Sequence, residues 1–191
     1  SIYAQNSKVV LFIMDGVSIS ELEETTTPNI DQLIADGAVG LMNVKTAGSL
    51  EPKDTYLTIG TGDRSNVGMA GYMNFNASEK YKETKAKSIY NRRVGQAKEG
   101  EIVNLELSKI QKSNQASTYQ ARVGYLANLL QEKDLQITVL GNADIKDQPR
   151  RQIGLIGINE YGVVKQGDVG QQMVQQVDQH PSSYITNQSH M

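Results

Sequence analysis

The sequence lacks cysteine, long apolar runs and an excess of charge of either sign. Without cysteine, disulfides, thiol chemistry and cysteine-ligated zinc are excluded. No apolar run approaches the roughly 20 residues that span a membrane. The 19 Lys and Arg residues face 21 Asp and Glu residues, which gives a formal net charge of -2 with no dense basic stripe. The composition therefore predicts an ordinary globular protein with no membrane span and no nucleic-acid partner.

The first residues, SIYAQ, do not form an obvious translation start. A removed signal peptide explains such a beginning, and so does an arbitrary boundary. Exported bacterial proteins often lack cysteine, as this chain does. This favours the first explanation, so we expect an exported or cell-surface bacterial protein.

Strand-like and helix-like segments alternate along the chain. The apolar run at residues 9–14 is typical of a strand buried on both faces of a parallel sheet. Thr27, Pro28 and Gly37 then mark the start, first turn and end of a helix. We expect further strands at residues 38–44, 135–140, 152–158 and 162–165, and further helices within 47–65, from 117 onward and over 169–177. The alternation predicts one α/β domain over residues 1–191, a three-layer open sheet that is mainly parallel, with helices on both faces.

Two stretches break this pattern. Residues 74–112 are rich in Lys and Glu with poor apolar periodicity, which indicates an irregular insertion or flap. Residues 179–191 show no core-facing pattern and are expected to form a frayed tail. His180 and His190 lie in or near this tail, and we interpret both as exposed side chains rather than ligands.

Ligands of parallel sheets gather at the carboxyl ends of the strands. This rule predicts that Asp15, the loop around Ser49 and residues 142–144 share one edge of the sheet. Asp15 directly follows the first strand, where its carboxylate suits either a hard or borderline dication or the capping of a loop. Both interpretations of Asp15 are open on position alone.

Hydroxyl side chains follow the second expected strand. Ser49, Thr55 and Thr58 are candidate nucleophiles or phosphate contacts, although a hydroxyl needs a base or a metal to become nucleophilic. The sequence places no evident base beside them. The stretch GTGDR at residues 60–64 suits an anion-binding turn with Arg64 as a phosphate clamp, or else an ordinary tight turn.

Four short motifs occur in a characteristic order: VLFIMDG at residues 10–16, TPNIDQLIADG at 27–37, LTIGTGDR at 57–64 and VLGNAD at 139–144. Their order resembles the amino-terminal half of the alkaline phosphatase superfamily, which includes sulfatases and cofactor-independent phosphoglycerate mutases. The second motif is similar to a sulfatase helix. The third is similar to the stretch after the mutase nucleophile, with one extra residue before the arginine. The absence of a Cys/Ser-x-Pro-x-Arg motif speaks against a sulfatase.

The resemblance implies a metal-dependent phosphohydrolase or phosphotransfer enzyme that acts on a small phosphate ester. Asp15 would be the first ligand of a divalent metal, zinc or manganese. Ser49, which follows Gly48, would be the nucleophile, with Thr55 as second choice. The phosphate-binding group would comprise Gly60, Gly62 and Arg64.

The superfamily takes most of its metal ligands from a second half rich in Asp and His motifs, and this sequence has none of them. We therefore expect the front part of a longer protein, inactive as this chain alone unless the missing half or a dimer partner completes it. The alternative is a non-catalytic binding or scaffolding domain with a degenerate phosphatase-like fold. A nucleotide-binding domain is less favoured, because no glycine-rich phosphate motif follows the first strand.

Overall fold

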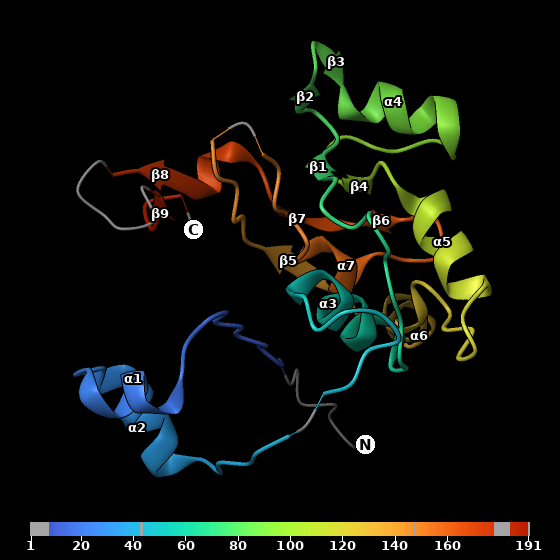
Figure 1. The fold of residues 1–191 in the computed structure, drawn as a ribbon. Helices are drawn as coiled ribbons and strands as arrows, with labels where there is room; N and C mark the ends of the chain where they lie inside the picture. Colours follow the sequence, from blue (N-terminus) through green and yellow to red (C-terminus); the bar gives the residue numbers. More distant parts are fainter. Residues whose placement is uncertain (1–7, 43, 147, 178–183, 191) are drawn as a thin grey trace, which may run out of the picture. The chain divides into compact units, whose positions relative to one another are not determined.

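The computed structural model describes residues 8–42, 44–146, 148–177 and 184–190. The chain divides into two compact units, residues 1–43 and 44–191, which are described one at a time. Within the described ranges the protein is mixed α/β, with seven α-helices and small, mostly antiparallel sheets (Figure 1). None of its described helices has the length and apolarity that a membrane crossing requires.

The first unit contains two short helices, α1 (Ile19–Glu24) and α2 (Pro28–Asp36). A capping box starts α1: the Ser18 hydroxyl accepts from the backbone N–H of Glu21, and the Glu21 carboxylate accepts from the backbone N–H of Ser18. The helix predicted between Thr27 and Gly37 is confirmed as α2, which has Thr27 at its N-cap, Pro28 in its first turn and Gly37 at its C-cap. Gly37, however, has a φ of -102° rather than the left-handed backbone expected.

The two strands predicted in this unit are not formed. Residues 8–14 and 38–42 have no strand pairing, and Val9 and Val10 are 94% and 85% exposed. A strand needs a neighbour to pair with its backbone N–H and C=O groups, and the regular elements among the described residues of this unit are both helices. The apolar run therefore lacks the sheet that its composition predicts.

The described residues of the second unit form four small sheets. Strands β1 (Asn74–Asn76), β4 (Ile102–Asn104) and β6 (Val163–Val164) form an antiparallel sheet in the order β1-β4-β6, β2 (Lys80–Tyr81) pairs with β3 (Thr84–Lys85), and β8 (Val174–Gln176) pairs with β9 (Tyr184–Thr186), both antiparallel. Strands β5 (Thr138–Leu140) and β7 (Gln166–Asp168) are parallel. The predicted α/β character is thus confirmed, and in the described residues β5 and β7 are a parallel pair among sheets that are otherwise antiparallel.

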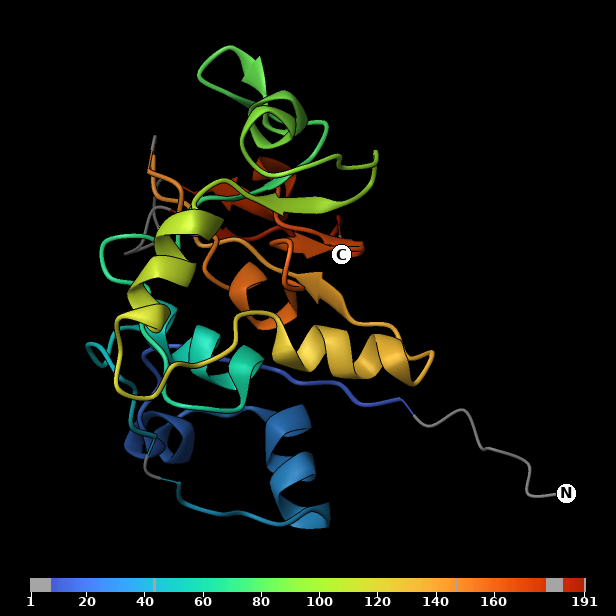
Figure 2. The same ribbon diagram turned by 90° about the vertical axis from the view of Figure 1, so that its right-hand side faces the viewer.

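Three helices of this unit lie together beside the sheets: α3 (Pro52–Thr61), α6 (Tyr125–Glu132) and α7 (Gly154–Gly157) (Figures 1 and 2). Gly60 makes the crossing of α3 and α7 possible, because a Cβ atom on it would lie only 2.6 Å from the carbonyl oxygen of Leu155. A Cβ atom on Gly157 would lie 2.5 Å from a methyl carbon of Val139. This close packing places a single helical turn where the sequence predicts a strand over residues 152–158.

Residues 74–112 form β1 to β4 and the helices α4 (Ala86–Arg93) and α5 (Leu107–Gln115). Their buried side chains build a hydrophobic cluster that includes Phe75, Tyr90 and Val103. The hydroxyl of Tyr90 donates to the carbonyl oxygen of Tyr161 at 2.7 Å, which ties this segment to the rest of the unit. The short helices and strands of this segment therefore contribute side chains to the hydrophobic core of the second unit.

Two segments predicted as helices differ from the elements that are observed. The helix predicted from Ser117 begins at Tyr125, because Gly124 adopts a left-handed φ of 86° next to the backbone of Asn159. Residues 169–177, predicted as a helix, form a single 3-10 turn, η1 (Gln171–Met173), followed by β8. Part of the tail predicted to fray pairs as β9 with β8.

Candidate functional site

The loop that precedes α3 holds a serine against a buried carboxylate. The Ser49 hydroxyl donates to Asp54 Oδ2 at 2.6 Å, and the Ser49 backbone N–H donates to the same oxygen at 3.1 Å. The other oxygen, Asp54 Oδ1, accepts from the backbone N–H of Val67 at 2.7 Å. Ser49 itself is exposed, whereas Asp54 is only 2% exposed. Ser49 is thus an exposed residue whose hydroxyl proton points at the buried carboxylate of Asp54.

Local sequence explains this geometry. Pro52 occupies the first turn of α3 and Asp54 is the acidic residue in that turn, two features that favour a helix start. Gly48 lets the loop come close, because a Cβ atom on it would lie 3.0 Å from Asp54 Oδ2. Ser49 is therefore held beside the amino-terminal end of a ten-residue helix, where the helix dipole favours a bound anion. Pro52 has no N–H, and the backbone N–H groups of Asp54 and Thr55 donate to the carbonyl oxygen of Glu51 at 3.0 and 3.2 Å.

A nearly buried lysine lies in the same helical turn. The Lys53 ammonium donates to the carbonyl oxygen of Gly68 at 2.7 Å, pairs with Glu51 at 3.0 Å and lies 5.3 Å from the ring centre of Tyr72. Its charge is thus used to join the start of α3 to the chain that follows the helix. Lys53 contributes to the rigidity of the site rather than to an open cationic surface.

The other two hydroxyl candidates are held further along α3. Thr55 is half-buried, and its backbone N–H donates to the carbonyl oxygen of Glu51 at 3.2 Å. The Thr58 hydroxyl lies 3.2 Å from that of Ser65, which is fully buried. Of the three predicted hydroxyls, Ser49 is the one that combines exposure with a carboxylate partner.

The predicted phosphate-binding group lies at the opposite end of α3. Gly60 is buried inside the helix, and Gly62 ends it with a left-handed φ of 66°. Arg64 donates to the Tyr119 hydroxyl at 2.8 Å, with its guanidinium 5.3 Å from the centre of that ring. At about 1.5 Å per residue, the ten residues of α3 separate its start from Gly62 by roughly 15 Å, so these two glycines lie away from Ser49. Arg64 follows the helix, and the segment after it returns to the Ser49 loop, where the backbone N–H of Ala47 donates to the carbonyl oxygen of Ser65 at 3.0 Å.

Asp15, the predicted metal ligand, is exposed in a turn of the first unit, whereas Ser49 belongs to the second. Among the residues that the structure describes, no three His, Asp or Glu side chains converge to hold a metal ion. Stable dication sites need several convergent protein ligands, so the described side chains do not fit the zinc or manganese of the resemblance.

A second polar group lies at the carboxyl ends of the parallel strands β5 and β7. The side-chain amide of Asn142 donates to the carbonyl oxygens of Val169 and Gly170 at 2.8 and 2.9 Å. Asp168 accepts from the Asn76 amide at 2.7 Å and lies 2.9 Å from the His190 ring. Residues 142–144 thus follow the carboxyl end of a parallel strand, as predicted. The Asn142 side chain, however, is used to hold a neighbouring loop through hydrogen bonds to Val169 and Gly170.

The pKa of Asp168 reflects these contacts. Burial alone would raise it, but hydrogen bonds from Asn76, from the backbone N–H of Gly170 and from His190, together with the attraction of His190, lower the pKa below its ordinary value. His190 is exposed, as predicted, and its ring also pairs with Asp168 of the second unit. His180 lies outside the described residues.

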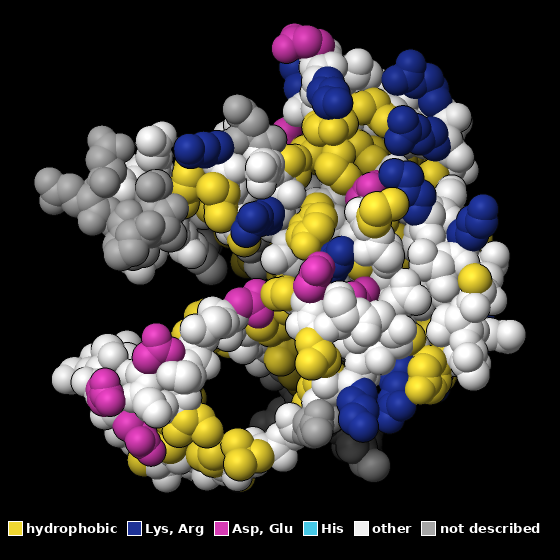
Figure 3. All heavy atoms as spheres, viewed as in Figure 1, with side chains coloured by type: hydrophobic (Ala, Val, Ile, Leu, Met, Phe, Trp, Pro, Cys, Tyr) yellow, Lys and Arg dark blue, Asp and Glu magenta, His cyan; other side chains and the backbone are white. Residues whose placement is uncertain are grey.

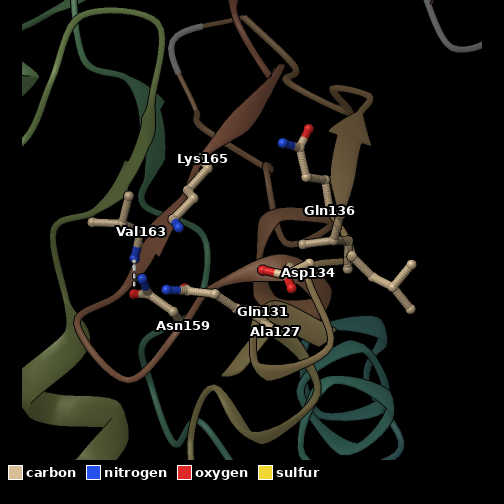
Figure 4. A pocket seen from close by; sticks show the side chains of 10 residues that line it. Ala127, Gln131, Asp134, Gln136, Asn159, Val163 and Lys165 are labelled. Carbon is tan, nitrogen blue, oxygen red and sulfur yellow. Dashed lines mark hydrogen bonds between the residues drawn. The ribbon is translucent and has the colours of Figure 1, made fainter. Parts of the chain in front are cut away.

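Figure 4 shows a small cavity beside α6, with Gln131, Asp134 and Lys165 around it. Its volume is about 170 Å³, below the range of about 300–1,000 Å³ typical of small-molecule sites. A larger cavity of about 460 Å³ lies between the β2–β3 hairpin, α4 and α5.

Sequence reasoning missed Asp54, the residue that gives Ser49 its partner. A usable signal was present, because an acidic residue two positions after a helix-starting proline is placed to accept from the loop that enters the helix. Ser49 precedes Asp54 by five residues, so a single loop is enough to bring the two side chains together.

No family model, no curated protein and no solved structure matches the chain.

Proposed function

We propose that the chain forms part of a phosphohydrolase-like or phosphotransfer domain of the alkaline phosphatase superfamily, with Ser49 as its nucleophile and with little or no turnover by this chain alone. The observation that carries the proposal is the exposed Ser49 hydroxyl, held at 2.6 Å from the buried Asp54 carboxylate at the amino-terminal end of α3. The order of the four sequence motifs supports it. The mainly parallel sheet of that superfamily is part of the same proposal, with β5 and β7 as its parallel pair.

The chemistry follows from these two side chains. Ser49 Oγ attacks the phosphorus of a small phosphate ester, so that an O–P bond forms while the bond to the leaving oxygen breaks. The hydroxyl proton passes to Asp54, and the leaving alkoxide takes a proton from water. The positive end of the α3 dipole stabilises the phosphoryl oxygens. Water then hydrolyses the phosphoserine, the proton held by Asp54 returns to Ser49 Oγ, and the cycle ends with inorganic phosphate.

Thr55 remains the second choice of nucleophile. Its half-buried position on the helix makes an in-line approach to a phosphoryl group harder than at Ser49. Gly60 and Gly62 lie at the carboxyl-terminal end of α3, so we assign them no contact with this phosphoryl group. Arg64 stays the candidate phosphate clamp, because the segment after it returns to the Ser49 loop.

The zinc or manganese of the resemblance, with Asp15 as first ligand, also remains a prediction. We assign no step to it, because the described side chains do not form its site. A second segment or a dimer partner would have to supply further ligands. We also propose that the protein is exported or displayed at a bacterial cell surface, in line with its lack of cysteine.

Trapping the phosphorylated enzyme tests the proposal. The protein is incubated with p-nitrophenyl phosphate, with and without Mn²⁺ or Zn²⁺, quenched in acid and mapped by mass spectrometry. This chain alone should turn over little or no ester, so the test reads a single phosphorylation event. We expect phosphate on the peptide that contains Ser49, its loss in Ser49→Ala, and its reduction in Asp54→Asn. Ser88→Ala removes an exposed serine of α4 and should change nothing. Phosphate on Thr55 would reassign the nucleophile, and no phosphate under any condition would refute the catalytic role.

A second candidate is the non-catalytic binding or scaffolding domain. The observation in its favour is that Asp54 accepts three hydrogen bonds from the loops around it, which suffices to explain its burial as a structural connection. In that case Asp54→Asn lowers the free energy of unfolding while no ester is hydrolysed by any variant.

A further inference from the structure

The larger cavity combines a basic rim with an apolar floor. The rim carries four cationic side chains, Lys82, Arg92, Arg93 and Lys109, from the β2–β3 turn, α4 and α5. Figure 3 shows Lys and Arg side chains gathered around apolar ones over this part of the unit. Its volume of about 460 Å³ falls within the range typical of small-molecule sites.

The rim carries an excess of positive charge. Its one carboxylate, Glu106, accepts from the backbone N–H of Gly71 at 3.0 Å and pairs with Lys109 at 3.3 Å. Arg93 donates to the carbonyl oxygen of Leu105 at 3.2 Å, a neutral acceptor. Three of the four cations are therefore not neutralised by any carboxylate of the lining, which favours a ligand with more than one negative charge.

The floor is part of the packed interior. Met73, Tyr81, Ile89 and Leu105 line the cavity and belong to, or pack against, the hydrophobic cluster of the unit. Tyr81 also lies against Phe75, with ring centres 5.1 Å apart. A floor held in this way presents a preformed apolar surface, so a ligand would not have to pay for ordering it.

We propose that this cavity binds a small organic phosphate whose apolar body, aromatic or aliphatic, covers the floor. A phosphate dianion matches the three cations that the lining leaves without a carboxylate, and a guanidinium such as that of Arg92 binds phosphate through two parallel N–H donors. The hydrophobic body accounts for the apolar floor, which inorganic phosphate would leave exposed. The inference does not depend on catalysis by Ser49.

Calorimetric titration with 2-naphthyl phosphate at low salt tests this proposal. The Ser49→Ala protein is used, so that the probe is not hydrolysed and a site at Ser49 is altered. We expect 2-naphthyl phosphate to bind more tightly than either inorganic phosphate or the neutral 2-naphthol. Lys82→Gln with Arg92→Gln should weaken binding by about tenfold or more, because charge-assisted hydrogen bonds are lost.

The matched control is Lys112→Gln with Lys133→Gln, which removes the same charge from exposed positions outside the lining. It should change the dissociation constant by less than about twofold, since distant exposed charges are screened. Equal weakening in both variants, or none in the Lys82/Arg92 variant, would overturn the proposal. So would binding to vesicles that contain phosphatidic acid without binding of free 2-naphthyl phosphate, which would indicate a membrane surface instead.

Discussion

A single buried arginine joins distant parts of the second unit. Arg151 is only 1% exposed, and its guanidinium donates to both carboxylate oxygens of Glu79 and, through two nitrogens, to Asp144 Oδ2 at 2.9 and 2.7 Å. It also lies 4.5 Å from the ring centre of Phe75. Residue 79 precedes the β2–β3 hairpin and residue 144 follows β5, so one side chain connects three separate stretches of the chain.

The electrostatics favour the charged form of Arg151. Burial alone would lower its pKa, but hydrogen bonds and attraction from Glu79 and Asp144 outweigh burial and raise the pKa above its ordinary value. Replacing Arg151 with methionine keeps much of the side-chain volume and removes the charge. Two carboxylates with side-chain exposures of 18% and 8% would then be left without their cation.

Breaking a buried ion pair from one side typically costs about 3–5 kcal/mol. We expect Arg151→Met to lower the free energy of unfolding by about this amount, measured by urea denaturation followed by circular dichroism. Additional replacement of Glu79 by Gln and Asp144 by Asn should recover part of the loss, because the uncompensated charges are then absent.

Arg150→Met is the matched control, since Arg150 is the exposed neighbour and its replacement should cost less than about 0.5 kcal/mol. If Arg151→Met cost less than about 1 kcal/mol, or if both variants cost the same, the buried network would not stabilise this unit and the argument would be wrong.

Two further stability predictions concern other parts of the second unit. Gly60→Ala should lower the free energy of unfolding by about 1–3 kcal/mol, because the new Cβ would lie 2.6 Å from the carbonyl oxygen of Leu155; Gly95→Ala, which meets nothing within 4 Å, should not destabilise the protein. Since the pKa of Asp168 is lowered in the folded state, its contribution to stability should be complete above its ordinary value of 3.8 and be lost as the pH falls through the folded pKa. His190→Gln should reduce this acid-side loss in unfolding curves measured from pH 6 to 2, and an unchanged pH profile would contradict the assigned contact.

The elements that the sequence predicted well begin and end with local signals. Thr27, Pro28 and Gly37 mark α2, and Gly62 provides the glycine turn after α3. Such signals act through the backbone of the residues themselves, so they hold whatever the rest of the chain does. Gly124 shows the limit, because its left-handed backbone beside Asn159 moves the start of α6 to a position that no local pattern indicated.

Strand predictions failed where the partner strand decides the outcome. The apolar run at residues 9–14 has the composition of a buried strand, yet no described strand pairs with it. Conversely, β1 and β4 lie within the Lys- and Glu-rich stretch that suggested an insertion, and they pair antiparallel with Phe75 opposite Val103. Composition describes what a segment can bury, whereas pairing depends on residues far away in the sequence.

The same distinction explains the candidate site. Ser49 and Asp54 are five residues apart and meet through one loop, so their contact was within reach of sequence reasoning once the helix start at Pro52 was recognised. The resemblance grouped Gly60, Gly62 and Arg64 with Ser49, but the two glycines lie at the carboxyl-terminal end of a ten-residue helix whose start lies beside Ser49. A nucleophile and its phosphate-binding groups must meet at one phosphorus atom. Ser49 therefore relies on the positive end of the α3 dipole if it transfers phosphate at all. Phosphorylation of Ser49 in the unaltered protein separates this role from a purely structural one, because Asp54→Asn removes hydrogen bonds of the loops in both cases.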